Sequence, residues 1–234
     1  MWDNTPLLRG IANLLFGISL LLMLYGVVRF VLHLPVFPLH AVELTAAPQR
    51  VSSGQLEKVV HEQLSGNFFT VDLERTRLAF EKLPWVRKVS VRRKFPWSLQ
   101  VEVEEQVALA RWNGVALVNT HGEVFAANTE QVLPAFIGQP DTSAQMTQMY
   151  AELNGALQPL QQQISQISLS PRFAWQVKLD NGMVLELGRE QMQQRLARFV
   201  AVYPYSLESN AQFVRHVDLR YRNGFAAYQP GSEV

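Results

Sequence analysis

The 234-residue sequence contains no cysteine, which excludes disulfide bonds and cysteine metal ligands. Its five histidines are scattered, without the spacing of a zinc site. Gly-rich phosphate loops, a His-Glu-x-x-His helix and a Gly-x-Ser-x-Gly elbow are all missing. A formal net charge of +1 gives no overall field for nucleic acid. We therefore expect a protein that is not an enzyme and uses no cofactor, metal, small-molecule substrate or nucleic acid.

Long apolar runs are also scarce, and the sequence has one of them. Residues 11–28 carry no charge, and the run continues past Arg29 to Leu34, which is long enough to cross a bilayer. A cleaved signal peptide is the alternative, but the run exceeds the usual length and the nearest small-residue site, Thr45-Ala46-Ala47, lies over ten residues beyond it. We predict an uncleaved transmembrane helix over residues 11–34, after a tail of residues 1–10. The flanking charges leave its orientation open.

Residues 35–105 have the pattern strand, helix, helix, strand, strand. Residues 41–46 predict a strand, and a Ser52-x-x-Gln55 capping box then opens a helix. Asp72 is the predicted N-cap of a second helix, which ends at Pro84. This order predicts a small three-stranded sheet covered by two helices.

In the last two predicted strands of this segment, apolar and polar residues alternate. The charged residues are basic on the first strand and acidic on the second. Apolar side chains occupy odd positions on both, so an antiparallel pair requires an odd loop. A three-residue loop (96–98) would set Val91 opposite Val103; we prefer five residues (94–98), which sets Val91 opposite Val101 and Lys88 opposite Glu104. The basic run 87–94 has the composition of a nucleic-acid patch, but the facing glutamates favour a charge-matched hairpin, whose cations can still offer a docking face.

Residues 106–234 predict a second mixed β domain. Strands are expected at 108–112, 115–119, 123–126, 165–169, 175–179 and 183–187. A three-residue loop ending in Gly182 would pair Val177 with Leu185. One helix is expected at 142–160, interrupted by Gly155, and a clearer one at 189–203, stopped by Pro204.

The chain closes on a hairpin in which Asn223-Gly224 is a strong two-residue turn signal. This turn would pair strand 214–222 with strand 225–229, placing Tyr221 opposite Ala226 and leaving Phe225 on the arginine face. The final strand is short and has no later element to cover it. This edge can accept a strand from a partner, or its shortness and the nearby arginines can protect it from such pairing. The residues alone do not decide between the two.

Several motifs together resemble the FtsQ/DivIB family of bacterial cell-division proteins. They are LPWVRKVSVRRKFPWSLQVEVEE (83–105), ARWNG (110–114), LGRE (187–190), RLARFVAVYP (195–204) and VDLRY (217–221). The resemblance implies an α+β chain in which the transmembrane helix precedes a POTRA domain (35–105) and an FtsQ-type β domain (106–234) with flanking helices. A POTRA-bearing component of a secretion or outer-membrane assembly system is the alternative, although that class usually has tandem POTRA domains or a barrel.

The resemblance also implies a non-enzymatic scaffold of the inner membrane at the division septum, with a cytoplasmic N-terminus and a periplasmic bulk. Family members bind FtsB and FtsL, and FtsB adds a strand to the final β-strand; POTRA and the transmembrane helix contact other division proteins. The matching FtsB-binding positions are Arg189, Arg220, Tyr221, Asn223 and Gly224, and Phe225 extends them. The family often has small residues and a Trp after this turn, where this chain reads FAAYQP. Recruitment positions are Lys88, Val91 and Arg93, although Val91 equally suits a core.

Overall fold

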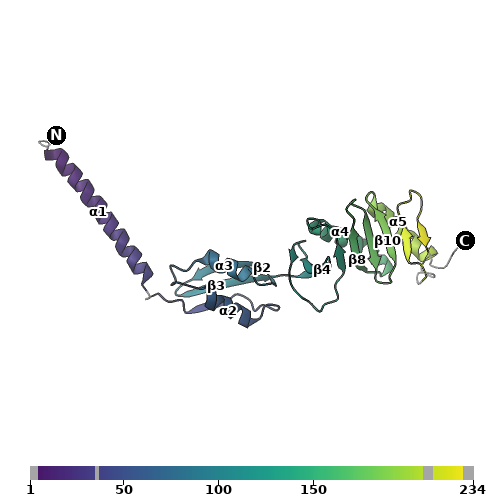
Figure 1. Ribbon diagram of the computed structural model, residues 1–234, viewed down its shortest axis with the longest axis horizontal. Coiled ribbons are helices and arrows are strands. Elements are labelled where there is room, and N and C mark those ends of the chain that lie inside the picture. Colours follow the sequence, from purple (N-terminus) through teal and green to yellow (C-terminus); the bar gives the residue numbers. More distant parts are fainter. Residues whose placement is uncertain (1–4, 35–36, 208–212, 229–234) are drawn as a thin grey trace. The chain divides into compact units, whose positions relative to one another are not determined.

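The computed structural model of the protein describes residues 5–34, 37–207 and 213–228 (Figure 1). The chain divides into two compact units, Met1–Glu105 and Gln106–Val234. The first contains α1 (Thr5–His33), of which Leu8–His33 is long and apolar enough to cross a membrane. The helix therefore begins within the segment that the sequence assigned to the tail. None of the most apolar stretch is buried against the rest of the protein, as a lipid-facing helix requires.

The remainder of the first unit is a three-stranded sheet with two helices on one face. Its strands are β1 (Ala41–Leu44), β2 (Val86–Lys94) and β3 (Ser98–Glu105), in the order β1-β3-β2. The helices are α2 (Ser53–Gln63) and α3 (Leu73–Glu81). Buried side chains of both helices and of β2 and β3 share one core cluster. The predicted strand-helix-helix-strand-strand order is confirmed.

Local signals decided where these elements begin. Ser52 and Gln55 form the predicted capping box, and the Asp72 carboxylate accepts from Arg75 N (3.0 Å) at the start of α3. The β2–β3 register places Val91 opposite Val101 and Lys88 opposite Glu104, as the five-residue loop predicted. Lys94 and Ser98 are themselves paired, so three residues connect the strands.

The end of β3 fixes the chain before α2. The Glu105 carboxylate accepts from the backbone N–H groups of Gln49, Arg50 and Val51 at 3.0, 2.8 and 3.0 Å. Burial opposes ionisation, but the three amide donors and the charge of Arg50 outweigh it and hold the pKa of Glu105 below its usual value. Because the folded pKa is lowered, this stabilisation is complete above the unfolded value near about 4.3 and is lost as the pH falls below it.

We therefore expect Glu105→Gln to lower the free energy of unfolding of the first unit by about 1–2 kcal/mol at pH 7. The gap between variant and parent should close as the pH falls below about 4. Denaturant unfolding of the full chain at several pH values measures both. Glu62→Gln is the matched control, since Glu62 lies in an exposed pair with Lys58 at 3.8 Å, worth less than about 0.5 kcal/mol. Equal effects of the two substitutions would contradict this account.

In its described residues, 106–207 and 213–228, the second unit contains a nine-stranded sheet. Its strands are β4 (Ala108–Trp112), β5 (Ala116–Asn119), β6 (Val124–Phe125), β7 (Ala135–Ile137), β8 (Ile164–Leu169), β9 (Trp175–Leu179), β10 (Val184–Gly188), β11 (His216–Asp218) and β12 (Ala226–Tyr228). Their spatial order is β12-β11-β10-β9-β8-β7-β4-β5-β6. Val177 pairs with Leu185, and Gly182 has φ +86°, so the predicted loop of the β9–β10 hairpin is confirmed.

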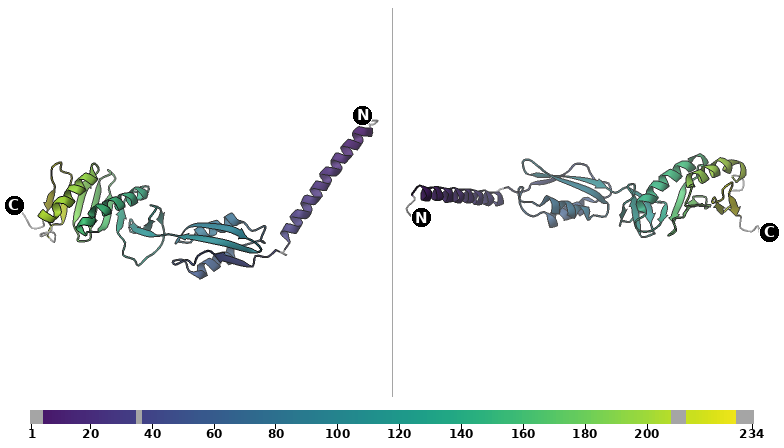
Figure 2. Two further views of the ribbon diagram at one scale, coloured as in Figure 1. Left: turned by 180° about the vertical axis from the view of Figure 1, so that it is seen from behind. Right: turned by 90° about the horizontal axis from the view of Figure 1, so that it is seen from above.

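Two helices cover one face of this sheet (Figure 2). They are α4 (Ser143–Leu157), followed by the 3₁₀ turn Gln158–Leu160, and α5 (Met192–Ser206). α4 connects the parallel strands β7 and β8, and α5 connects the parallel strands β10 and β11. Buried side chains of both helices join those of the strands in one large core.

In this unit, the sequence-based expectations for two helices and one strand are wrong. α4 continues through Gly155, because its buried Leu153 and Leu157 hold both sides of the glycine in the core. α5 starts three residues late and contains Pro204, whose missing amide donor is tolerated where Tyr203 and Leu207 are buried on either side. β7 was not predicted, because three residues give too short a pattern to recognise.

Candidate partner-binding site

β12 lies at one edge of the nine-stranded sheet and is exposed along its whole length. Its pairing with β11 determines which backbone groups remain free. In the parallel ladder of β10 and β11, Val184 N donates to Arg215 O (2.9 Å) and Leu219 N donates to Glu186 O (3.0 Å). Because ladder bonds alternate along a strand, Val217 between them directs its own N–H and C=O toward β10.

His216 and Asp218 therefore direct their backbone groups toward β12, where they lie opposite Tyr228 and Ala226. Ala227, opposite Val217, must direct its N–H and C=O away from the sheet. Among the described residues, no strand lies beyond β12. The sheet thus ends in an outward-facing donor and acceptor at Ala227, which a partner strand could use.

The predicted register of this hairpin is wrong. The sequence placed Tyr221 opposite Ala226 across an Asn223-Gly224 turn, whereas Asp218 lies there. Neither Asn223 nor Gly224 has the positive φ that such a turn needs. The connection is instead the long loop 219–225. Gln229, the last residue of the predicted strand, lies outside the described residues.

Tertiary contacts hold this loop open. Arg198 of α5 donates to the backbone oxygens of Tyr221 and Arg222, and Arg220 N donates to Asp218 Oδ1 (2.9 Å). Phe225 packs edge-to-face on the buried Phe199, with ring centroids 5.8 Å apart. Phe225 therefore faces the helix-covered core rather than the arginine face, and Ala226 and Tyr228 are exposed rather than buried. Tyr221 is also exposed, at 57%.

Beside the loop lies a shallow, cation-rich depression of about 440 Å³. Its lining residues are Arg172, Ala174, Gly188, Arg189, Glu190, Arg195 and Arg220. Gly188 has φ +75°, and a Cβ there would lie 2.8 Å from Arg195 Nη1. The glycine of the LGRE motif thus lets a guanidinium pack directly on the backbone.

The arginines of the depression differ in how far they are committed to the fold. Arg195 Nη1 donates to Leu187 O (2.8 Å). Arg220 forms a two-pronged pair with Asp218, at 2.9 and 2.7 Å, and this hydrogen-bonded partner holds the pKa of Asp218 below its usual value. Arg172 and Arg189 are exposed, so their charge remains available to an anionic group.

Of the predicted residues, the structure brings Arg189 and Arg220 together at the depression. Tyr221, Asn223 and Gly224 follow in the adjoining loop, and Phe225 anchors it. Sequence reasoning missed Arg172, which stands in no motif, and the loop-holding Arg198, which lies within RLARFVAVYP but was given no role. It also missed Ala227, whose role depends on the register.

The predicted recruitment residues share strand β2 but not one face. Lys88 is exposed on the open face, where it lines a depression with Ser90 and Arg92. Val91 is partly buried against the helices. Arg93 donates to the backbone oxygens of Phe68 (2.8 Å) and Val71 (2.9 Å), so it holds the loop before α3.

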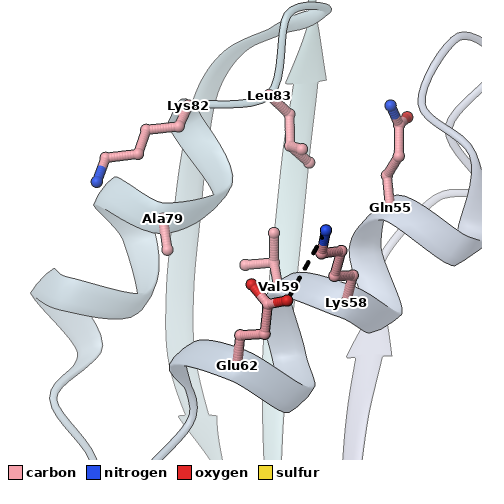
Figure 3. Close-up of a pocket in the computed structure, with 7 residues that line it drawn as sticks. All are labelled: Gln55, Lys58, Val59, Glu62, Ala79, Lys82 and Leu83. Carbon is pink, nitrogen blue, oxygen red and sulfur yellow. Dashed lines mark ion pairs between the residues drawn. The ribbon is translucent and has the colours of Figure 1, made fainter.

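A further depression of about 360 Å³ lies between α2 and α3 (Figure 3). Its apolar lining is Val59, Ala79 and Leu83, while the Lys58–Glu62 pair and Lys82 supply charge. The Lys58 and Glu62 side chains are 72% and 56% exposed and 3.8 Å apart, which is the geometry of a solvated surface ion pair. Within the described residues, no group of three or more His, Cys, Asp or Glu side chains could hold a metal ion.

Comparison with known proteins agrees with this architecture. Residues 37–106 match the family model described as POTRA domain, FtsQ-type, and residues 110–220 match that of cell division protein FtsQ/DivIB, C-terminal. The chain is 43% identical over 232 residues to cell division protein FtsQ of Nitrosospira multiformis, covering 97% of this chain and 98% of that protein. It is 39% identical over 251 residues to FtsQ of Bordetella pertussis, covering 97% and 92%. FtsQ of Neisseria gonorrhoeae is 34% identical over 230 residues, covering 97% and 94%. The chain belongs to the FtsQ/DivIB family of bacterial cell-division proteins.

Proposed function

We propose that this protein is a non-enzymatic scaffold of the divisome that captures FtsB, with FtsL, on the free edge of β12. The observation that carries the proposal is the outward N–H and C=O of Ala227 on an exposed edge strand. α1 anchors the scaffold in the inner membrane, with the N-terminus in the cytoplasm, both folded units in the periplasm, and the assembly at the septum.

An added strand gains main-chain hydrogen bonds at β12 but needs side-chain contacts for specificity. The depression beside loop 219–225 supplies them, because Arg189 and Arg172 can receive carboxylates from the incoming segment. Tyr221 offers an exposed aromatic surface on the same loop. The edge, the loop and the depression together make one continuous docking site for FtsB.

The POTRA domain, proposed as residues 35–105, contributes to recruitment by other membrane proteins of the divisome, together with α1. Lys88 can contact such a partner directly, since it is exposed on the open face of the sheet. Arg93 and Val91 stabilise the fold of the domain, because Arg93 donates to the loop before α3 and Val91 packs in the core beneath the helices. The β domain, proposed as residues 106–234, is the main binding unit.

Tyr221→Asp tests the proposal in the full chain. We expect it to weaken capture of FtsB about thirtyfold, since it replaces an exposed aromatic beside the docking edge with a charge. Val115→Asp is the matched control, because Val115 is 86% exposed in the same unit and belongs to the β4–β5 turn. Quantitative co-purification with FtsB measures both; equal capture by the two variants, both folded, would exclude docking at loop 219–225.

A fluorescent fusion of the full chain tests the divisome role separately. We expect fluorescence at midcell in dividing cells, and loss of the midcell fluorescence when other divisome proteins are depleted. Uniform signal along the envelope at every stage would contradict the division role and favour a POTRA-bearing component of an assembly system.

A further inference from the structure

One end of the first unit carries a cluster of aromatic rings that the proposed function does not use. The cluster, here called the aromatic foot, comprises Phe37, Phe68, Phe69, Phe95 and Trp97. Ring centroids of neighbouring members lie 5.2 to 6.2 Å apart. The foot is therefore a single packed surface built from three separate segments of the chain.

The rings are unequally exposed. Phe68 is buried, whereas Phe95 is 82% exposed and Phe69 is 44% exposed. Phe95 lies on the short β2–β3 connection, and Phe69 lies in the loop before α3. A contiguous exposed apolar surface is typical of a site that contacts another protein or a membrane.

The covalent chain limits how far the foot can lie from the membrane. Phe37 belongs to the foot and is four residues beyond His33, the last residue of α1. Four residues span at most about 14 Å when fully extended, so Phe37 lies within about 14 Å of the end of α1. The headgroup region of one leaflet is about 5–8 Å thick, so the foot is within reach of it. The foot therefore stays beside the membrane surface whatever the angle between the helix and the sheet.

Polar contacts reinforce this tether. Asn67 Nδ2 donates to the backbone oxygens of Leu32 (2.7 Å) and Leu34 (3.0 Å) at the end of α1. The Asn67 carboxamide oxygen accepts from Phe69 N (3.0 Å), so one buried side chain links the helix end to the foot. Phe68 N also donates to Phe37 O at 3.0 Å.

We propose that the aromatic foot inserts Phe95 and Phe69 into the headgroup region of the bilayer that α1 crosses, and so gives the POTRA domain a second contact with the membrane. Aromatic side chains favour this region, because their rings leave bulk water without entering the hydrocarbon core. Lys94 at the same end of β2 is half-exposed, but its ammonium already pairs with the Glu43 carboxylate at 2.5 Å, so the aromatic rings carry the proposed contact.

Depth-dependent quenching tests the contact in the full chain. The natural sequence has no cysteine, so Phe95→Cys can carry a single environment-sensitive fluorophore. Gln49→Cys is the matched control: the Gln49 amide donates to the Glu105 carboxylate at the far end of β3, seven residues and about 23 Å from Ser98. In vesicles of phosphatidylethanolamine and phosphatidylglycerol, nitroxide lipids should quench position 95 at least about threefold more than position 49. Equal quenching would overturn the proposal.

Hydrogen exchange removes the influence of the label. In lipid nanodiscs, the amides of residues 67–71 and of Phe95, Trp97 and Ser98 should exchange about tenfold more slowly in the parent chain than in the Phe69→Ser, Phe95→Ser double variant. Leu78→Ser is the control, since Leu78 on α3 is 48% exposed outside the foot. Unchanged exchange in the β2–β3 ladder shows that each variant is folded. Equal exchange rates in the parent and the double variant, both in purified nanodiscs, would refute lipid contact. This is also the result expected if the foot binds only another protein, because no other protein is present.

Discussion

Replacing Ala227 with proline should lower the affinity for FtsB about a hundredfold, which corresponds to about 2.7 kcal/mol. Proline removes the outward N–H that a partner strand would use and places its ring in the path of that strand. The pairing of β12 with β11 should survive, because His216 and Asp218 bond to Tyr228 and Ala226 rather than to Ala227. The measurement is a binding titration of the full chain, in detergent, with the periplasmic segment of FtsB.

Ala227→Ser provides the matched control, since serine keeps the N–H and differs from alanine by one oxygen atom. We expect its affinity to remain within about threefold of the parent chain. Thermal unfolding of both variants should match that of the parent, which separates loss of docking from loss of fold. Undiminished binding by Ala227→Pro would show that FtsB does not pair with this edge.

The second large effect is expected in the core that holds the edge in place. Phe199→Ala should destabilise the second unit by about 3–5 kcal/mol, because Phe199 is fully buried in the sheet–helix core. Its ring contacts Tyr203 and Phe225, with centroids 5.4 and 5.8 Å away. The substitution therefore also releases the loop that leads into β12. Denaturant unfolding of the full chain, followed by near-ultraviolet circular dichroism, measures the loss.

Phe80→Ala is the matched variant in the first unit, where Phe80 is also fully buried. It should destabilise that unit by a similar amount and leave FtsB affinity at temperatures well below unfolding unchanged. A loss of less than about 1 kcal/mol from Phe199→Ala would contradict full burial of Phe199 in the sheet–helix core.

Much of the fold could be predicted because local patterns and tertiary packing agree. The capping box at Ser52, the alternation of β2 and β3, and the positive φ at Gly182 each depend on a few neighbouring residues. Elements that depend on contacts between residues far apart in the sequence were harder to predict. α5 passes through Pro204 because burial of its apolar face outweighs the local cost of the proline.

In the candidate site, too, some residues could be identified from local motifs, whereas others depend on distant contacts. The motifs identified Arg189 and Arg220, which the fold brings together at one depression. The Asn223-Gly224 turn failed because Arg198, over twenty residues away in sequence, holds the loop backbone, and Phe225 takes a place in the core. A register that is set by such contacts cannot be read from the hairpin sequence alone. The importance of Ala227 became visible only with that register.

Residue-resolved hydrogen exchange at Ala227 tests the central claim most directly. In the free protein, the Ala227 amide should exchange rapidly, while the Ala226 and Tyr228 amides, which bond to β11, exchange slowly. Saturation with the periplasmic segment of FtsB should slow exchange at Ala227 at least about a hundredfold and change its neighbours much less. An Ala227 amide that still exchanges freely in the saturated complex would contradict strand addition at β12.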